Sequence, residues 1–254
     1  AVHAGDVIET HLVETEPSDG ILPRPVPFSV VYEDDDILVV DKPADTPIHP
    51  SIGNYENTLA NGIAWYFEQK GEPFVYRCIN RLDRDTTGLI VLAKHALSAA
   101  VLSQAMRSRE IHRTYQAFAL GETAASGTID APIGRDPNSV VGRCVRPDGA
   151  RAVTHYEVLG RSNGLSLLRL RPETGRTHQL RVHMASIGCP LAGDWLYGEE
   201  DPDLIPRPAL HAYALDLDHP VTGEHLSLTA PIPADMARLA PELLTETECA
   251  SEEI

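Results

Sequence analysis

Cysteine is scarce in this chain, and its few copies lie far apart. The four are Cys78, Cys144, Cys189 and Cys249. Because no two of them form a Cys-x-x-Cys pair, neither a structural zinc site nor a disulfide framework is indicated. No apolar run reaches membrane-spanning length, and the first residues lack a signal-peptide pattern. These absences favour a soluble cytoplasmic protein whose cysteines are small buried or incidental thiols.

The signatures of several enzyme classes are also missing. No serine lies in a Gly-x-Ser-x-Gly elbow, and no Gly-x-x-x-x-Gly-Lys loop is present. Neither that class of hydrolase nor nucleotide-dependent chemistry is therefore supported. His178 and His183 are five residues apart on an expected helix, so they do not share a face as metal ligands at i, i+4 would. The sequence predicts no metal site.

Basic residues are fewer than acidic ones, 21 against 37, which gives a net charge of −16. Their distribution along the chain is uneven. Residues 77–183 hold 16 Lys and Arg against 9 Asp and Glu, whereas the rest of the chain holds 5 against 28. A locally basic face attracts polyanions even on an acidic protein. The pattern favours a nucleic-acid partner for the middle of the chain, although acidic ends that merely aid solubility would also explain it.

One stretch, Ile79 to Lys94, begins with charge and ends in an apolar run. Asp83 lies between Arg81 and Arg84, and a turn-prone Thr-Thr-Gly link leads into apolar residues 89–92. This pattern predicts a polar loop that feeds a buried strand, which is a common place for catalytic groups. Two neighbouring guanidinium groups favour the charged form of a carboxylate, which can then act as a nucleophile or an electrostatic stabiliser. A surface ladder of ion pairs explains the same residues equally well.

Hydrophobic periodicity predicts many short strands and a few helices. We expect a hairpin over residues 28–41, a helix from a Thr58 cap to Phe67, a helix over 96–110, and strands at Val2–Ile8, 113–120, 127–133, 152–159, 165–170, 209–217 and 224–229. Strands that follow one another in sequence favour an α+β domain around a mixed, largely antiparallel sheet with flanking helices. We expect residues 1–27 to be an extension with a proline-rich linker, 28–235 the main domain, and 236–254 an acidic, weakly patterned tail.

A second polar cluster opens a short expected helix. Thr177 can cap this helix, and its apolar positions are Leu180, Met184 and Ile187. His178 and Arg181 both lie in its first turn, where cations oppose the helix dipole unless an anion is close. This local conflict between sequence and structure is a hint of function.

At this point the residues resemble a known family. Residues 81–89, Arg-Leu-Asp-Arg-Asp-Thr-Thr-Gly-Leu, resemble the signature of RNA pseudouridine synthases of the RluA type. Residues 175–183, Gly-Arg-Thr-His-Gln-Leu-Arg-Val-His, resemble the second long motif of the same family. Shorter matches at 32–34, 39–44, 188–194, 210–212 and 219–220 follow the family's order. The resemblance runs from about Phe28 to Pro233, so the main domain is expected to be the catalytic domain, with the pseudouridine synthase fold and a central catalytic cleft.

The resemblance implies catalytic roles for three residues. Asp83 corresponds to the catalytic aspartate, Tyr115 to a tyrosine that stacks on the flipped uracil, and Arg181 to the arginine that pairs with the catalytic carboxylate. These roles fit the chemistry of the side chains. A base must leave the stack before its glycosidic bond can be reached, an aromatic ring can stack on any base, and a guanidinium can hold a carboxylate at two points.

Three further residues are expected to bind the substrate or the RNA. Arg81 corresponds to an arginine that helps hold the target base out of the RNA helix, and Arg176 and His178 belong to the second motif. The chain departs from the family at Asn80, where a histidine is usual, and at Thr87, where a serine is common. Residues 2–8 look like the last turn of a small S4 RNA-binding domain whose other parts are missing, which shifts RNA binding to the basic middle of the chain.

The implied reaction converts uridine in structured RNA to pseudouridine, with ribosomal RNA favoured over transfer RNA. The bond from ribose C1′ to uracil N1 breaks, the base turns, and C5 bonds to C1′. Bond breaking builds positive character at the sugar, as in glycoside hydrolysis. Asp83 can stabilise that charge, attack the sugar or remove a sugar proton, and the sequence leaves these alternatives open. The reaction requires no cofactor, and we expect a monomer that uses none.

The sequence is also compatible with two other functions. The chain could be a non-catalytic RNA-binding or RNA-folding protein on the same scaffold, but retention of Asp83, Tyr115 and Arg181 together argues against this. It could also be a nucleoside glycosidase, which would release free uracil instead of an isomerised residue.

Overall fold

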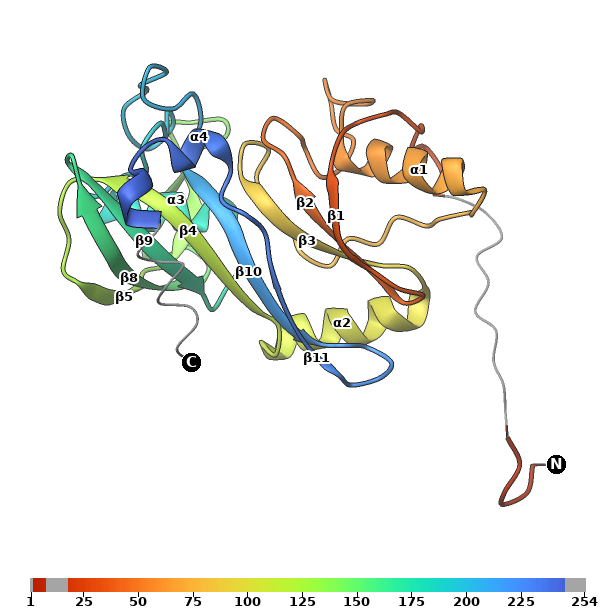
Figure 1. Cartoon of the computed structure of the whole chain (residues 1–254). Coiled ribbons are helices and arrows are strands. Elements are labelled where there is room, and N and C mark those ends of the chain that lie inside the picture. Colours follow the sequence, from red (N-terminus) through yellow and green to blue (C-terminus); the bar gives the residue numbers. More distant parts are fainter. Residues whose placement is uncertain (1, 8–17, 245–254) are drawn as a thin grey trace.

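A nine-stranded sheet organises the chain in the computed structural model, which describes residues 2–7 and 18–244 (Figure 1). The strands are β1 (Ser29–Glu33), β2 (Ile37–Lys42), β3 (Thr87–Ala93), β4 (His112–Leu120), β5 (Ser126–Asp130), β6 (Ile133–Arg135), β7 (Arg143–Val145), β8 (Val153–Ser162), β9 (Leu165–Pro172), β10 (Leu210–Asp218) and β11 (His225–Thr229). The helices are α1 (Leu59–Lys70), α2 (Ala96–Ser108), α3 (Gln179–Ser186) and α4 (Ala234–Ala237).

The order of strands in the sheet is β1-β2-β3-β10-β4-β9-β8-β5, with β11 paired to β10, while β6 and β7 form a separate hairpin. Within the described sheet, β3 and β10 are parallel and the other paired strands are antiparallel. This arrangement confirms the predicted α+β class and the mixed, largely antiparallel sheet.

Strand β2 is buried on both of its faces, because helices cover both. Leu38 and Val40 belong to the core cluster that contains the apolar side chains of α1. Ile37 and Val39 point the other way and share a second cluster with Leu102 of α2. The two-residue side-chain period of a strand thus places α1 and α2 on opposite faces. A strand covered on both faces reads as a continuous apolar run, as the sequence of β2 does.

The start of α1 confirms the predicted cap. The Thr58 hydroxyl accepts the amide N–H of Asn61, and the Asn61 side chain accepts the amide N–H of Thr58, which completes a capping box. The helix ends at Gly71, whose φ of 71° is the left-handed conformation that glycine adopts at little cost.

The parallel contact between β3 and β10 is short and very close. Gly88 has a φ of 109°, and a Cβ atom there would lie 2.3 Å from the carbonyl oxygen of Ala212. No other residue type fits this crossing without movement of the backbone. Beside it, the Thr87 hydroxyl lies 2.9 Å from Nδ1 of His211. The crossing therefore fixes the loop before β3 next to the first residues of β10.

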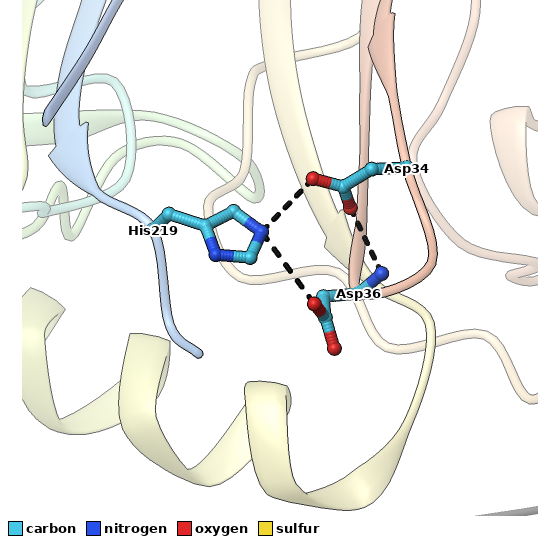
Figure 2. A group of neighbouring side chains, drawn as sticks. All are labelled: Asp34, Asp36 and His219. Atoms are coloured by element: carbon cyan, nitrogen blue, oxygen red, sulfur yellow. Dashed lines mark hydrogen bonds and ion pairs between the residues drawn. The ribbon is translucent and has the colours of Figure 1, made fainter. Parts of the chain in front are cut away.

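At the end of β10 that lies away from Gly88, a histidine connects the chain after β10 to the turn between β1 and β2. His219 Nε2 lies 2.9 Å from Asp34 Oδ2 and 3.7 Å from Asp36 Oδ2 (Figure 2). Its Nδ1 accepts the amide N–H of Thr222 at 3.1 Å, so the ring proton is on Nε2 and faces the carboxylates. The cluster is a clamp between the β1–β2 turn and the β10–β11 turn.

Some sequence expectations are wrong or shifted. The strand expected at Val2–Ile8 is absent from residues 2–7, where Val2 and Val7 are 70% and 93% exposed and have no sheet face to cover; its last residue and the extension up to residue 17 lie outside the described residues. The strand expected at 127–133 is two strands, β5 and β6, because Pro132 between them has no N–H for a ladder.

The chain after β11 packs against the protein, a feature that the weak patterning of its sequence does not indicate. Met236, Ala240, Leu243 and Leu244 are buried in a third core cluster beside Phe118 of β4. Residues 245–254 lie outside the described part. None of the described helices has the length and apolar character that crossing a membrane requires.

The buried His211 should make the fold less stable in acid. Burial lowers the pKa of His211 from 6.5 to about 4. Between these two values the unfolded chain binds more protons than the folded one, so the free energy of unfolding falls as pH drops, by at most about 3 kcal/mol. Urea denaturation at neutral pH and near pH 4 should show a larger loss for the wild type than for His211→Gln. An equal loss in both proteins would contradict this assignment.

Candidate active site

A cavity of about 410 Å³ opens over the loop that precedes β3. Its walls come from that loop, the end of α2, strand β4, and the segment from Pro172 to the first turn of α3. All of the site residues predicted from sequence line it: Arg81, Asp83, Tyr115, Arg176, His178 and Arg181. Three stretches that are far apart in sequence, around residues 79–86, 106–115 and 172–181, thus meet in one cleft, together with Leu210 of β10.

The cleft is rich in positive charge. The arginines in its lining are Arg81, Arg107, Arg109, Arg113, Arg176 and Arg181, and its lining carboxylates are Asp83 and Glu173. All of these residues belong to the basic middle of the chain. Each oxygen of Glu173 already has a basic partner: one lies 2.8 Å from Arg109 Nη1 and the other 2.9 Å from His155 Nε2. The uncompensated charge of the cleft suits a polyanionic ligand.

Two buried basic side chains, Lys42 and Arg207, hydrogen-bond to backbone carbonyl oxygens of the loop that contains Asp83. Lys42 is fully buried, and its ammonium donates to the carbonyl oxygens of Pro43, Thr46 and Arg84 at 2.8, 3.0 and 2.9 Å. Burial lowers the pKa of Lys42 to about 7. Arg207, which also pairs with a carboxylate of α4, donates to the carbonyl oxygen of Asp85 at 3.3 Å.

The two arginines next to Asp83 in sequence do not both flank it in space. Arg84 is exposed and lies 3.2 Å from Asp85 and 3.4 Å from Asp45, so for Arg84 the interpretation as a surface ion pair is correct. Arg81 is exposed at the cleft. The cation paired with Asp83 comes from α3 instead: Arg181 Nη1 lies 3.6 Å from Asp83 Oδ2.

Arg181 is held chiefly by a carboxylate that the sequence analysis missed. Its Nε and Nη2 each donate to Asp194 at 2.7 Å, in a two-point pair in which Asp194 is fully buried. Burial alone would lower the pKa of Arg181, but the hydrogen bonds and charge of Asp194 and the charge of Asp83 raise it. Two nitrogens of the guanidinium are thus committed to Asp194, and the third faces Asp83.

The first turn of α3 shows why cations are tolerated there. The expected Thr177 cap is wrong by one residue: His178 is the cap, with a left-handed φ of 56° and no capping side chain. The Gln179 side chain accepts the amide N–H of Arg176 instead, at 3.0 Å. The anion that the dipole argument required is present, because Asp83 and Asp194 both face Arg181.

Tyr115 belongs both to the core and to the cleft. It is 6% exposed, packs in the main hydrophobic cluster and lines the cavity. Its position on β4 is fixed by pairing with Leu170 of β9. Burial raises the pKa of Tyr115, and the charge of Asp83 adds to this rise. The aromatic ring is therefore rigidly held beside the carboxylate.

Asn80 has a defined structural role at the position where the family usually has histidine. Its amide donates to the carbonyl oxygen of Leu89 at 3.0 Å and accepts the N–H of Val91 at 2.8 Å. These two bonds attach the segment before Arg81 to β3. Asn80 thus supplies a hydrogen-bonding link between the loop and the strand.

Tyr197 is a second residue that the sequence analysis missed. Its hydroxyl lies 2.6 Å from His178 Nδ1 and accepts the amide N–H of Arg143 at 2.9 Å, while the Arg181 guanidinium lies 5.0 Å from its ring centre. The matched segment 188–194 contains Asp194 and ends just before Tyr197, so that match was the available signal for this part of the site.

Together, these features define the class of protein. A cleft lined by six arginines holds the carboxylate of Asp83 beside the buried ring of Tyr115, as expected for an enzyme that acts on a nucleotide of RNA. The sequence pattern of the RNA pseudouridylate synthase family matches residues 36–186.

Full-length relatives agree with this match. RNA pseudouridine synthase YhcT of Bacillus subtilis is 44% identical over 242 residues, which cover 94% of this chain and 79% of the relative. Ribosomal large subunit pseudouridine synthase D of Escherichia coli is 40% identical over 250 residues, covering 91% and 75%. A solved structure, human RNA pseudouridylate synthase domain containing 1, superposes with a TM-score of 0.69 at 28% identity, covering 89% of each chain. The chain belongs to the RNA pseudouridine synthase family, whose members are isomerases.

Removing Arg181 should destabilise the fold more than removing the whole ion pair. Arg181→Met leaves the buried Asp194 carboxylate without its guanidinium, which costs about 3–5 kcal/mol in comparable pairs. In the double variant Arg181→Met/Asp194→Asn, the neutral amide oxygen can still accept the backbone N–H groups that Asp194 now accepts. We expect urea denaturation to show that the double variant recovers much of the loss. A single variant as stable as the wild type would contradict the buried pair.

Proposed function

We propose that Asp83 is the carboxylate that acts on the ribose of a uridine flipped into the cleft. The observation that carries this proposal is the position of Asp83, which lines the cavity with Tyr115 while one of its oxygens faces Arg181 at 3.6 Å. Arg181 is already bound at two points by Asp194, so it can orient Asp83 without being drawn away from Asp194. Tyr115 supplies the surface for the flipped base.

The proposed reaction is balanced without any external reactant. The C1′–N1 bond breaks, uracil turns within the cleft, and its C5 forms a bond to C1′. The hydrogen of C5 leaves as a proton, and N1 ends with a proton in its place. Positive character builds on the sugar while the first bond breaks. An anion fixed beside the sugar lowers the energy of that state, whether it acts through charge or by transient bonding to C1′.

For the substrate we propose a uridine in large-subunit ribosomal RNA, in the cytoplasm of a bacterial cell. The support is the group of bacterial relatives named ribosomal large subunit pseudouridine synthase D, which are about 40% identical to this chain. Arg81, Arg176 and His178 at the cleft would contact the RNA around the target. Mapping pseudouridines across all RNAs in cells with and without this protein would identify the site; loss of a transfer-RNA position alone would contradict the ribosomal assignment.

Replacing Asp83 with Asn should abolish turnover while RNA binding persists. The amide keeps the shape of the side chain but removes the negative charge, for which the reaction has no substitute. Release of tritium from 5-tritiated uridine in RNA reports the loss of the C5 hydrogen directly. Asp85→Asn is the matched control, because Asp85 pairs with the exposed Arg84 and should matter less.

The outcomes separate the competing functions. If the wild type and Asp83→Asn release tritium equally on an RNA that both bind, the role of Asp83 is wrong. If neither releases any from cellular RNA that lacks pseudouridine, the protein is an RNA-binding protein on this scaffold.

Substitutions at Tyr115 should distinguish stacking from packing. Tyr115→Phe keeps the ring and should bind RNA about normally, whereas Tyr115→Ala should lose roughly 1–3 kcal/mol of binding free energy. Thermal melting of both variants gives the control, since Tyr115 is also part of the core. If Tyr115→Ala melts much earlier but its folded fraction binds with unchanged affinity, the residue serves packing alone.

A further inference from the structure

A short chain of contacts runs from the buried ion pair to the β6–β7 hairpin through one tyrosine. Asp194, which holds Arg181, also accepts the backbone N–H of Tyr197 at 3.2 Å. The ring of Tyr197 then lies against Arg181, with 5.0 Å from the guanidinium carbon to the ring centre, and edge-on to His178. One carboxylate thus fixes both the catalytic-site arginine and the tyrosine beside it.

The Tyr197 hydroxyl has two close partners, and one of them can only donate. The amide N–H of Arg143, in the first residue of β7, donates to the hydroxyl oxygen at 2.9 Å. The second partner is His178 Nδ1 at 2.6 Å. If Nδ1 carried a proton, both partners would donate to the same oxygen, and the hydroxyl hydrogen would find no acceptor among the described residues. All of these polar hydrogens have an acceptor only when the Tyr197 hydroxyl donates to an unprotonated Nδ1 of His178.

The other ring nitrogen of His178 then carries the proton. Among the residues that the structure describes, none is within hydrogen-bonding reach of Nε2, and His178 lines the catalytic cavity. Burial lowers the pKa of His178, with Arg181 and Arg143 adding to the effect and Asp83 and Asp194 opposing it. The imidazole is therefore neutral and has one N–H without a protein partner.

We propose that Tyr197 is a positioning residue that holds His178 as the Nε2-protonated tautomer, so that His178 donates a hydrogen bond to an oxygen of the target nucleotide. The inference rests on the proposed function, because it assigns an acceptor on the bound uridine. A neutral donor suits this place, since a further cation beside Arg181 would weaken the hold of that arginine on Asp83. His178 is the N-terminal cap residue of α3 and has a left-handed backbone conformation, and its side chain lines the cavity.

The tautomer can be measured without any substrate. Two-bond ¹⁵N–¹H correlation spectra distinguish the two ring nitrogens of a neutral histidine, and His178→Asn assigns the signal by removing it. Asparagine is chosen because it tolerates the left-handed φ of 56°. We expect the proton of His178 on Nε2 in the wild type, and a mixture of tautomers in Tyr197→Phe. Tyr66→Phe, which removes a remote hydroxyl bound to Glu33, is the matched control and should leave the signal unchanged.

Turnover of RNA, followed by tritium release, tests the consequence. Tyr197→Phe keeps the ring against Arg181 and should lower kcat/KM by roughly three- to tenfold, the value of one neutral hydrogen bond. Combined with His178→Asn, it should cause no further loss, because it acts through His178. A wild-type His178 protonated on Nδ1, or losses that multiply in the double variant, would overturn the proposal. Failure of the wild type to release tritium would overturn the proposed function instead and leave the tautomer measurement valid.

Discussion

The buried pair between Arg181 and Asp194 is the constraint on which the active site depends. Removing both charges from water is costly, and the cost is offset by two 2.7 Å hydrogen bonds and by the backbone N–H groups that Asp194 also accepts. Because this pair occupies two nitrogens of the guanidinium, the third is left for Asp83. Two carboxylates thus share one arginine, and in the proposed mechanism they place net negative charge beside the sugar that becomes positive, in a cleft whose other arginines suit phosphates.

The sheet brings these groups together from distant parts of the chain. Asp83 comes from the loop before β3, Tyr115 from β4, and Arg181 from α3. The close crossing at Gly88 sets the distance between β3 and β10, and β10 pairs in turn with β4. Lys42 fixes the backbone of the loop by donating a hydrogen bond to the carbonyl oxygen of Arg84. The catalytic geometry is therefore a property of the sheet and its loops together, and the clamp at His219 closes the far end of the same sheet.

Much of this arrangement could be predicted from sequence, where local patterns decide structure. The Thr58 cap and the run that forms β3 follow from short-range rules, and the two long motifs contain every predicted residue of the cleft except Tyr115. The sequence did not predict which charged side chains contact one another in the folded protein. Arg84 adjoins Asp83 in the chain but faces solvent, whereas Asp194 lies thirteen residues beyond Arg181 with no periodicity to connect them. The strand expected at Val2–Ile8 is absent from the described residues 2–7, because propensity without a partner strand does not make a sheet.

The most direct test of the account is the nucleoside composition of RNA before and after incubation with the protein. Digestion of the RNA and chromatography with mass detection separate pseudouridine from uridine, which have equal mass but different retention. If the cleft isomerises a flipped uridine, pseudouridine should appear in the same amount as uridine disappears, and no free uracil should be released. Release of free uracil with an abasic site left in the RNA would contradict the account, because the cleft would then break the glycosidic bond without reforming it at C5.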